Sequence, residues 1–529
     1  MPKWLSNALF YEIYPQSFYD SNGDGIGDLN GIRKKLDYIQ SLGCNALWLN
    51  PCFESPFQDA GYDVSDYRKI APRYGTNGDM KALIDDVHAR GMHILLDLVP
   101  GHTSIEHPWF KASAQSDKGP LAGRYIWTNT KEEADDPDLT AENREKLADY
   151  PGAGRGGKYY FNYYDIQPAL NYGFAHPIKS WQSATDSPEA LATREELKNI
   201  MRFWLDMGAD GFRVDMAYSL VKNDGAGHEE TQKLWRDVRA MLDAEYPNAA
   251  IVSEWFNPSQ SLACGFHADF YLQANLSYMA LVMTGEDAFF NPAGDGNCAG
   301  FAEEYTEYLD TASRFPGSYV STPTGNHDVL RMSYGRSERQ IKLLHAFDMT
   351  LPGLPVIYYG DEIGMKYLEL ESKEGGLYRT GSRTPMQWDS TKNAGFSTAD
   401  DPAALYLPID PDENRPTVER EDGDPESILS NMRRLIQLRK NTPALGNDGK
   451  FEIVYAEFCE YPLVYKRYKE NSRYYIVVNP GANPCTVSFD TCYALKEPIY
   501  EIGDTMTVTR DGNTNTISVT PESFAIFTE

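Results

Sequence analysis

The sequence predicts an α/β fold, a (β/α)8 TIM barrel in which eight strands alternate with helices. The first observation is a repeated pattern of amphipathic helix, glycine-containing turn and short apolar strand, clearest at 31–51, 80–100 and 196–216. The second is that the strands are nearly continuous runs of Val, Ile, Leu and Phe, which is typical of parallel strands covered on both faces. A doubly wound open sheet is the alternative, but no glycine-rich phosphate loop follows any of these strands.

Taken in order, the helices of the pattern place apolar residues at i, i+3, i+4 and i+7, and each is followed by its strand. Further strands are expected at short apolar runs that no amphipathic helix of this pattern precedes. The eight strands are predicted within 9–15, 31–51, 80–100, 196–216, 233–255, 268–273, 318–328 and 340–360.

One connection is much longer than the others. More than a hundred residues separate the third strand (93–100) from the fourth (211–216), where about thirty would serve. Because a structureless loop of that length is improbable in a compact fold, we predict a small inserted domain. After residue 445 the helical period stops, and short alternating stretches predict a C-terminal antiparallel β-sandwich. The predicted domains are the barrel at 1–102 and 181–445, the inserted domain at 103–180 and the sandwich at 446–529.

The amino-acid composition limits which kinds of molecule the protein is expected to bind. The 529 residues include 77 Asp and Glu against 49 Lys and Arg, a net charge of −28, which argues against nucleic acid and anionic membrane surfaces but not against a neutral ligand. No apolar run is long enough to span a membrane, and the N-terminus lacks the apolar core of a secretory signal. Seven scattered Cys without a CxxC pair predict a reducing, cytoplasmic setting. The 35 Tyr, 23 Phe and 9 Trp suggest stacking surfaces for flat ligands such as sugar rings.

Polar residues at the carboxyl ends of barrel strands point into the active site of such a fold, whereas those in the middle of a strand are packed. The third predicted strand ends LLDLVPGH, the fourth reads GFRVD, the fifth ends IVSE and the seventh ends TPTGNHD. We therefore expect carboxylates, histidines and one arginine to converge on one mouth of the barrel. The residues selected are Asp97, His102, Arg213, Asp215, Glu254, His327 and Asp328.

The types and spacing of these residues favour glycoside hydrolysis. Arg213 and Asp215 lie two apart on one strand, so both face inward, and the guanidinium favours the ionised carboxylate that a nucleophile needs. Glu254 is flanked by Trp255 and Phe256, an apolar surround that would raise its pKa toward that of a general acid. Two carboxyl groups about 5–5.5 Å apart would select a covalent, retaining mechanism. The sequence has no GxSxG elbow and no zinc or redox-metal spacing, which argues against acyl transfer and metallohydrolysis.

Four segments together resemble the signature regions of glycoside hydrolase family 13, the α-amylase superfamily: DLVPGH (97–102), GFRVD (211–215), SEW (253–255) and GNHD (325–328). Their order and separations agree, and the resemblance extends over nearly the whole chain. It implies a barrel with a domain inserted after strand three and a C-terminal sandwich. The roles that it implies are nucleophile for Asp215, acid/base for Glu254, transition-state stabiliser for Asp328, and hydrogen bonds to the glucosyl unit for His102, Arg213 and His327.

Further segments resemble the α-glucosidase and oligo-1,6-glucosidase branch of that family. QDAGYDVSDY (58–67) implies that Tyr62 stacks on the reacting glucose and that Asp59 binds its non-reducing terminal hydroxyl. RTPMQWD (383–389) implies an arginine, Arg383 or the nearby Arg379, that pairs with Asp59 and closes the pocket at one end. QPALNY (167–172) resembles QPDLN, with Ala169 in place of Asp, and Tyr163 stands where a pocket aromatic is expected. A blind pocket implies exo action.

The segment DSNGDGIGD (20–28) places oxygen side chains at every second position around a glycine turn, as in the first part of an EF-hand loop. Gly31 stands where the bidentate Glu of an EF-hand would be. The resemblance to the α-glucosidase branch implies a structural Ca2+ here; the alternative is a loop without metal, and the sequence does not distinguish Ca2+ from Mg2+. The ligands would be Asp20, Asn22, Asp24, Asp28 and the carbonyl of Ile26.

We therefore expect a cytoplasmic, retaining, exo-acting α-glucosidase for small neutral α-glucosides: isomalto- or malto-oligosaccharides or sucrose-like disaccharides. A glucosyltransferase or isomerase of the sucrose isomerase or trehalose synthase type is the first alternative, because the same site transfers glucose if a sugar hydroxyl outcompetes water. An endo-amylase is disfavoured by the predicted Asp59–Arg383 closure. A non-catalytic transporter heavy chain is disfavoured because the carboxylates are kept. Linkage preference, aglycone and oligomeric state are left open.

Overall fold

Eight parallel strands form a closed barrel in the computed structural model, which describes all residues except 1, 138, 272–275, 283–287 and 374–378. Around the barrel the strands follow the order β1-β12-β11-β10-β9-β8-β5-β2, and every neighbouring pair is parallel. The predicted (β/α)8 barrel is therefore confirmed. The barrel strands are β1 (Phe10–Ile13), β2 (Ala46–Leu49), β5 (His93–Leu98), β8 (Gly211–Val214), β9 (Ala250–Ser253), β10 (Ala268–Phe270), β11 (Tyr319–Pro323) and β12 (Leu354–Tyr358).

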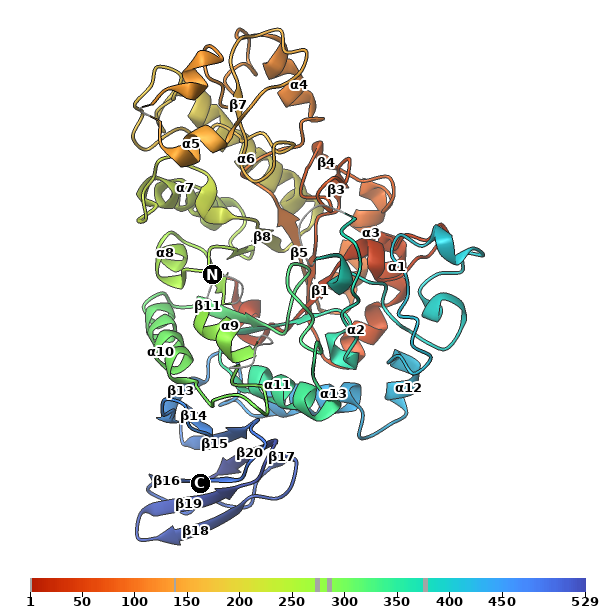
Figure 1. The fold of residues 1–529 in the computed structure, drawn as a ribbon, viewed down its shortest axis with the longest axis vertical. Coiled ribbons are helices and arrows are strands. Elements are labelled where there is room, and N and C mark those ends of the chain that lie inside the picture. Colours follow the sequence, from red (N-terminus) through yellow and green to blue (C-terminus); the bar gives the residue numbers. More distant parts are fainter. Residues whose placement is uncertain (1, 138, 272–275, 283–287, 374–378) are drawn as a thin grey trace.

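Helices surround the barrel and bury their apolar faces against it (Figure 1). The longest, α6 (Pro188–Met207), begins at Ser187, whose side chain accepts a hydrogen bond from Ala190 N, and ends at Gly208, which has φ 115°. Its apolar stripe includes the buried Leu197 and Trp204. The other helices of this layer are α1 (Leu29–Lys34), α2 (Leu36–Leu42), α3 (Asn77–Ala89), α7 (Glu229–Glu245), α8 (Pro258–Ala263), α9 (Leu276–Val282), α10 (Ala299–Ser313), α11 (Glu338–Thr350) and α13 (Ile428–Asn441).

The long connection between β5 and β8 forms a lobe at one end of the molecule (Figure 1). It carries its own small apolar cluster, which includes Ile126, Tyr160, Phe174 and Trp181. A separate cluster agrees with an inserted domain, while the exact limits at 103 and 180 remain a prediction. The elements here are α4 (Pro108–Gln115), α5 (Ala141–Glu145), β6 (Leu147–Ala148) and β7 (Tyr159–Tyr160); the hairpin β3 (Phe53–Glu54) and β4 (Asp66–Ile70) precedes β5.

The C-terminal part lies at the opposite end and consists of two antiparallel sheets, as predicted (Figure 1). The sheets bury a shared apolar layer, in which Val477 and Phe527 of one meet Val487 and Ile517 of the other. One sheet has the order β13 (Lys450–Tyr455), β14 (Leu463–Lys469), β15 (Ser472–Asn479), β20 (Ser523–Thr528) and β17 (Tyr500–Ile502), and the other β16 (Cys485–Asp490), β19 (Thr514–Val519) and β18 (Thr507–Asp511). A short helix, α12 (Val418–Asp422), precedes α13.

Across the described residues, no helix combines the length and the apolar character that crossing a membrane requires.

Candidate active site

A cavity of about 220 Å3 lies where the barrel strands end, at their carboxyl side. Three carboxylic acids selected from the sequence, Asp215, Glu254 and Asp328, line it together. They follow β8, β9 and β11, which confirms that strand ends on this face converge. The remaining lining residues are Asp59, Tyr62, His102, Tyr163, Gln167, Met216, Tyr218, Phe256 and Arg379.

The chain turns sharply after both β8 and β9. Met216 and Phe256 have left-handed backbone, with φ 39° and φ 60°, which is uncommon for residues other than glycine. The turn after β8 directs the Met216 N–H at the Oε2 atom of Glu254, 2.9 Å away. Strained backbone at these two positions therefore helps to place the acid of the neighbouring strand.

Arg213 joins the acids of three strands. Its Nη1 atom lies 3.0 Å from Asp97 Oδ1 and 3.1 Å from Asp215 Oδ1, and its Nη2 atom lies 3.0 Å from Glu254 Oε2. The guanidinium is almost completely buried, and the ring of Trp48 lies 5.1 Å from its centre. A hydrogen bond also joins the carboxyl groups of Asp215 and Glu254. The two predicted reacting carboxyls are therefore in contact.

The carboxyl groups in the cavity differ in how their surroundings shift their pKa values. Burial raises the pKa of Asp215, and the neighbouring Glu254 raises it further, while Arg213 acts in the opposite direction. Arg213 thus acts in the predicted direction, but burial and Glu254 outweigh it in the free protein. Burial and the nearby Glu254 therefore favour the protonated form of Asp215 in the free protein. For Asp328 burial also raises the pKa, but the positive charges of Arg379 and Arg383 bring it well below its usual range.

His327 does not line the cavity itself but contacts Tyr62, which does. Its Nε2 atom lies 2.6 Å from the Tyr62 hydroxyl, and the two rings are stacked with centroids 5.4 Å apart. Its Nδ1 atom lies 2.8 Å from Oε1 of Glu12 on β1, to which Asn50 also donates a hydrogen bond. Burial raises the pKa of Glu12 and lowers that of His327, so both groups are held neutral. Glu12 was missed by the sequence analysis, since only its place on β1 could have suggested it.

Asp59 and its partners form one part of the cavity lining. Gln167 donates a hydrogen bond of 2.7 Å to Asp59 Oδ2, and Arg379 Nη1 lies 3.5 Å from Asp59 Oδ1. Arg379 Nη2 also donates to the hydroxyl of Tyr163, at 3.4 Å. Burial raises the pKa of Asp59 to about 6, although Arg379 and Gln167 oppose that rise. An arginine therefore contacts Asp59 as predicted, Gln167 is a further partner that was not predicted, and closure of the pocket stays a prediction.

The arginine that contacts Asp59 is Arg379 rather than Arg383. The two residues flank a single 3-10 turn, Thr380–Ser382. Arg383 is fully buried and instead donates to the carbonyl of His327, at 2.7 Å, and to Asp328 Oδ1, at 3.0 Å. Arg383 thus binds the Asp328 carboxylate but is not one of the residues that line the cavity.

His102 lines the cavity as expected, and each of its two ring nitrogens contacts a neighbouring residue. Its Nε2 atom lies 3.1 Å from the carbonyl of Tyr62, and its Nδ1 atom lies 3.3 Å from Nδ2 of Asn162. Burial lowers its pKa to about 3, so it faces a ligand as a neutral imidazole. Tyr218, whose pKa burial raises to about 12, was also missed; it comes from the loop after β8, where the strand-end filter could have found it.

The loop 20–28 folds around Asp20, which is buried. Oδ1 of Asp20 accepts hydrogen bonds from the N–H groups of Asn22 and Gly23, and Oδ2 accepts from Gly25 N and Ser397 Oγ. Carboxylate, amide and carbonyl oxygens are the donors that a hard cation such as Ca2+ prefers, so the donor set fits the ion. Among the described residues no three His, Cys, Asp or Glu side chains group closely enough to hold a metal by themselves. The Ca2+ site stays a prediction that also requires Asn22 and the carbonyl of Ile26.

Comparison with known proteins agrees with this geometry. Residues 12–448 match the family described as Alpha amylase, catalytic domain. The chain is 32% identical to the trehalose synthase/amylase TreS of Mycobacterium tuberculosis over 482 residues, 84% of this chain and 76% of that relative. It is 31% identical to the oligo-1,6-glucosidase of Heyndrickxia coagulans, covering 93% of this chain and 94% of that relative. Among solved structures, the trehalulose synthase MutB from Pseudomonas mesoacidophila MX-45 superposes with a TM-score of 0.82 at 26% identity over 99% of both chains.

A family match over most of the chain, together with relatives above 30% identity over most of their own length, shows the family. The chain belongs to glycoside hydrolase family 13, the α-amylase superfamily, and is an enzyme that acts on α-glucosides.

Proposed function

We propose that the protein is a retaining, exo-acting α-glucosidase for short, neutral α-glucosides. The observation that carries the proposal is the contact between Asp215 and Glu254 inside a small cavity, with one guanidinium bound to both carboxyl groups. Such a pair can act on the two sides of one anomeric carbon.

In the proposed reaction, Glu254 donates its proton to the glycosidic oxygen while Asp215 attacks the anomeric carbon, so the leaving alcohol departs and a glucosyl ester forms on Asp215. Glu254, now a carboxylate, then takes a proton from an incoming water, whose oxygen displaces Asp215. Arg213 stabilises each carboxylate as it becomes charged, because it contacts both. Asp328 remains ionised throughout and accepts hydrogen bonds from sugar hydroxyls.

We infer exo action from Asp59 and its partners Gln167 and Arg379, which line the same small cavity as the reacting acids. We propose that they hold the terminal glucose, so that the sugar chain does not continue past them. A carboxylate there accepts hydrogen bonds from the hydroxyl groups of a terminal glucose. We expect one glucose to be released from the non-reducing end.

A second activity of the same site is favoured by the comparisons. TreS is named a trehalose synthase/amylase, and the MutB structure, a trehalulose synthase, covers 99% of this chain. In the proposed site a sugar hydroxyl could take the place of water as the acceptor of the glucosyl group. The covalent ester on Asp215 would serve either acceptor, so we keep glucosyl transfer or isomerisation as the alternative.

We also propose a cytoplasmic setting, without nucleic-acid or membrane partners. Cys44, Cys52, Cys264 and Cys298 are buried as thiols. Buried thiols are typical of proteins kept in a reducing compartment.

Product analysis separates hydrolysis from transfer. With maltose, isomaltose and sucrose, each at low concentration, we expect free glucose to form in proportion to substrate lost. Chromatography of the products is the measurement. Sustained formation of a rearranged disaccharide at low substrate would favour the isomerase instead.

Removal of either reacting carboxyl should abolish the activity. We expect Asp215→Asn and Glu254→Gln to lower kcat on any α-glucoside by at least about 1,000-fold, with melting temperatures near that of the wild type. With an activated glucosyl fluoride, the Glu254→Gln variant should accumulate an ester, detected by mass spectrometry as one added glucosyl group on Asp215. Wild-type turnover by either variant would refute the assignment.

Loss of the Asp59 carboxylate should impair recognition of the terminal glucose. We expect Asp59→Asn to lower kcat/KM on a disaccharide by about 10- to 100-fold, since a hydrogen bond to a charged group is lost. Because the pKa of Asp59 is raised to about 6, it gains a proton as the pH falls through that value, and the KM of the wild type should rise there. The KM of Asp59→Asn should not change over this interval. Asp165→Asn, the same change at an exposed residue two positions before Gln167, is the matched control.

The proposed Ca2+ in the loop 20–28 can be tested by its effect on stability. A cation that binds the folded chain alone raises the melting temperature. We expect a chelator to lower it in the wild type, and Ca2+ to restore it. The Asp24→Ala variant, whose exposed side chain is a proposed ligand, should melt at one temperature with or without the chelator. An unchanged wild-type melting temperature after dialysis against chelator would count against the metal.

A further inference from the structure

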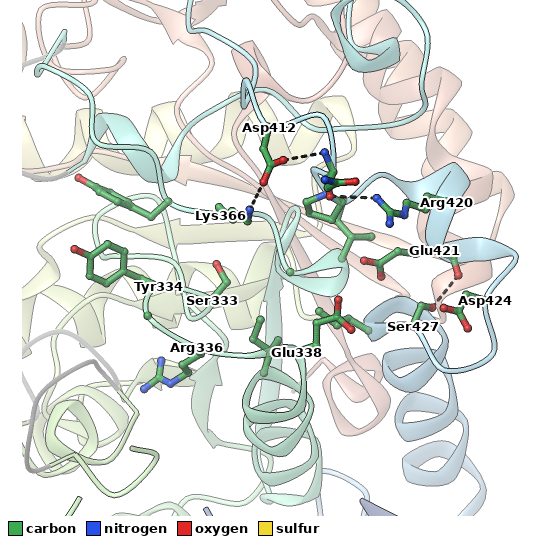
Figure 2. A pocket seen from close by; sticks show the side chains of 18 residues that line it. Ser333, Tyr334, Arg336, Glu338, Lys366, Asp412, Arg420, Glu421, Asp424 and Ser427 are labelled. Atoms are coloured by element: carbon green, nitrogen blue, oxygen red, sulfur yellow. Dashed lines mark hydrogen bonds and ion pairs between the residues drawn. The ribbon is translucent and has the colours of Figure 1, made fainter. Parts of the chain in front are cut away.

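A second cavity, of about 620 Å3, lies outside the active site and shares no lining residue with it (Figure 2). It is nearly three times larger than the active-site cavity. The loop after β11, the start of α11, the chain after β12 and the segment 412–428 form its walls. Its volume is in the range of ligand-binding sites in proteins.

One side of this cavity carries a tyrosine whose ring is held in place (Figure 2). Tyr334 is 37% exposed, and its ring meets that of Tyr367 edge-on, with centroids 5.6 Å apart. Its hydroxyl donates a hydrogen bond of 3.2 Å to Glu369. A fixed, half-exposed aromatic ring offers an apolar face at little entropic cost, and the C–H faces of sugar rings pack on such surfaces.

The cationic side chains of the cavity are already engaged. Lys366 forms an ion pair of 2.6 Å with Asp412, and Arg420 donates to the carbonyl of Asn414. Arg336 donates to the carbonyls of Met332 and Val282. These cations are therefore not arranged to bind an anionic ligand such as a phosphate.

Carboxyl groups dominate the other side, where Glu421 and Asp424 face Tyr334 across the cavity and Glu338 lies below (Figure 2). Glu421 accepts one hydrogen bond from Leu429 N, and burial raises its pKa to about 7, so it both donates and accepts hydrogen bonds at neutral pH. Carboxyl groups repel anions and accept hydrogen bonds from hydroxyl groups. Within the described ranges these acids are not among any group of three or more that could hold a metal ion.

We propose that this cavity is a second, non-catalytic binding site for a neutral saccharide, which stacks on Tyr334 and donates hydroxyl hydrogen bonds to Glu421 and Asp424. The polar and aromatic surfaces face each other across a volume that accommodates a small oligosaccharide. Binding here does not depend on the roles assigned to Asp215 and Glu254. The site would let the enzyme hold a glucoside outside its reaction pocket.

The test is a titration of the full chain carrying Glu254→Gln, so that the ligand is not consumed. Maltotriose and isomaltotriose are the probes, and calorimetry at high protein concentration is the measurement. We expect two binding events for at least one probe. Adding Tyr334→Ala should weaken one event about tenfold, as loss of a stacking ring does, while adding Asp59→Asn should weaken the other. Glu421→Gln is a second variant that should act on the same event as Tyr334→Ala.

Tyr493→Ala is the matched control, because Tyr493 is 65% exposed and lines neither of the two cavities. It should leave both events unchanged. A single binding event for both probes, an effect of Tyr334→Ala no larger than that of the control, or displacement of the second event by inorganic phosphate would overturn the proposal. Turnover of a probe by the Glu254→Gln chain would contradict the catalytic assignment instead, and the response of the second event to Tyr334→Ala would still decide this site.

Discussion

A single buried guanidinium is the interaction on which the rest of the active site depends. Arg213 cannot be left unpaired in the barrel interior, because burying a charge without a partner is very costly. Three acids surround it, Asp97, Asp215 and Glu254, from three adjacent strands. One positive charge does not compensate three negative charges, so the cluster retains a proton, and burial raises the pKa of both Asp97, to about 6, and Asp215. The arrangement that brings the two reacting carboxyls together therefore also favours retention of a proton by this cluster in the free protein.

Around Asp328 the balance of charge is reversed, because positive groups outnumber negative ones. Asp328 lies beside Arg379 and Arg383, with ion pairs of 3.3 Å and 3.0 Å, so its carboxylate remains charged. One small space thus contains an aspartate whose pKa is raised, Asp215, and an aspartate whose pKa is lowered, Asp328, and environment rather than residue type makes the difference. The lasting negative charge of Asp328 would suit an oxocarbenium-like transition state in this cavity.

The sequence predicted the barrel, the sandwich and the acids at strand ends because these depend on local periodicity and on a rule of the fold. It could not choose between Arg379 and Arg383, since both flank one 3-10 turn and only the path of the loop decides which reaches Asp59. Glu12 was out of reach for a similar reason: it is far from His327 along the chain, and their contact exists only after the barrel closes. The pKa of Asp215 depends on burial and on Glu254 together, which no sequence spacing encodes.

The choice between hydrolysis and transfer, which the sequence motifs leave open, concerns the residues beside the reacting acids. Met216, Tyr218 and Phe256 come from the loops after β8 and β9 and line the cavity next to Asp215 and Glu254. The left-handed backbone of Met216 and Phe256 fixes where their side chains stand. The acids would serve hydrolysis and transfer alike, because both reactions begin with the same attack on the anomeric carbon. We therefore infer that the balance between water and a sugar as the acceptor depends on these three side chains, which stand beside the acids and can stack on a ring or exclude solvent.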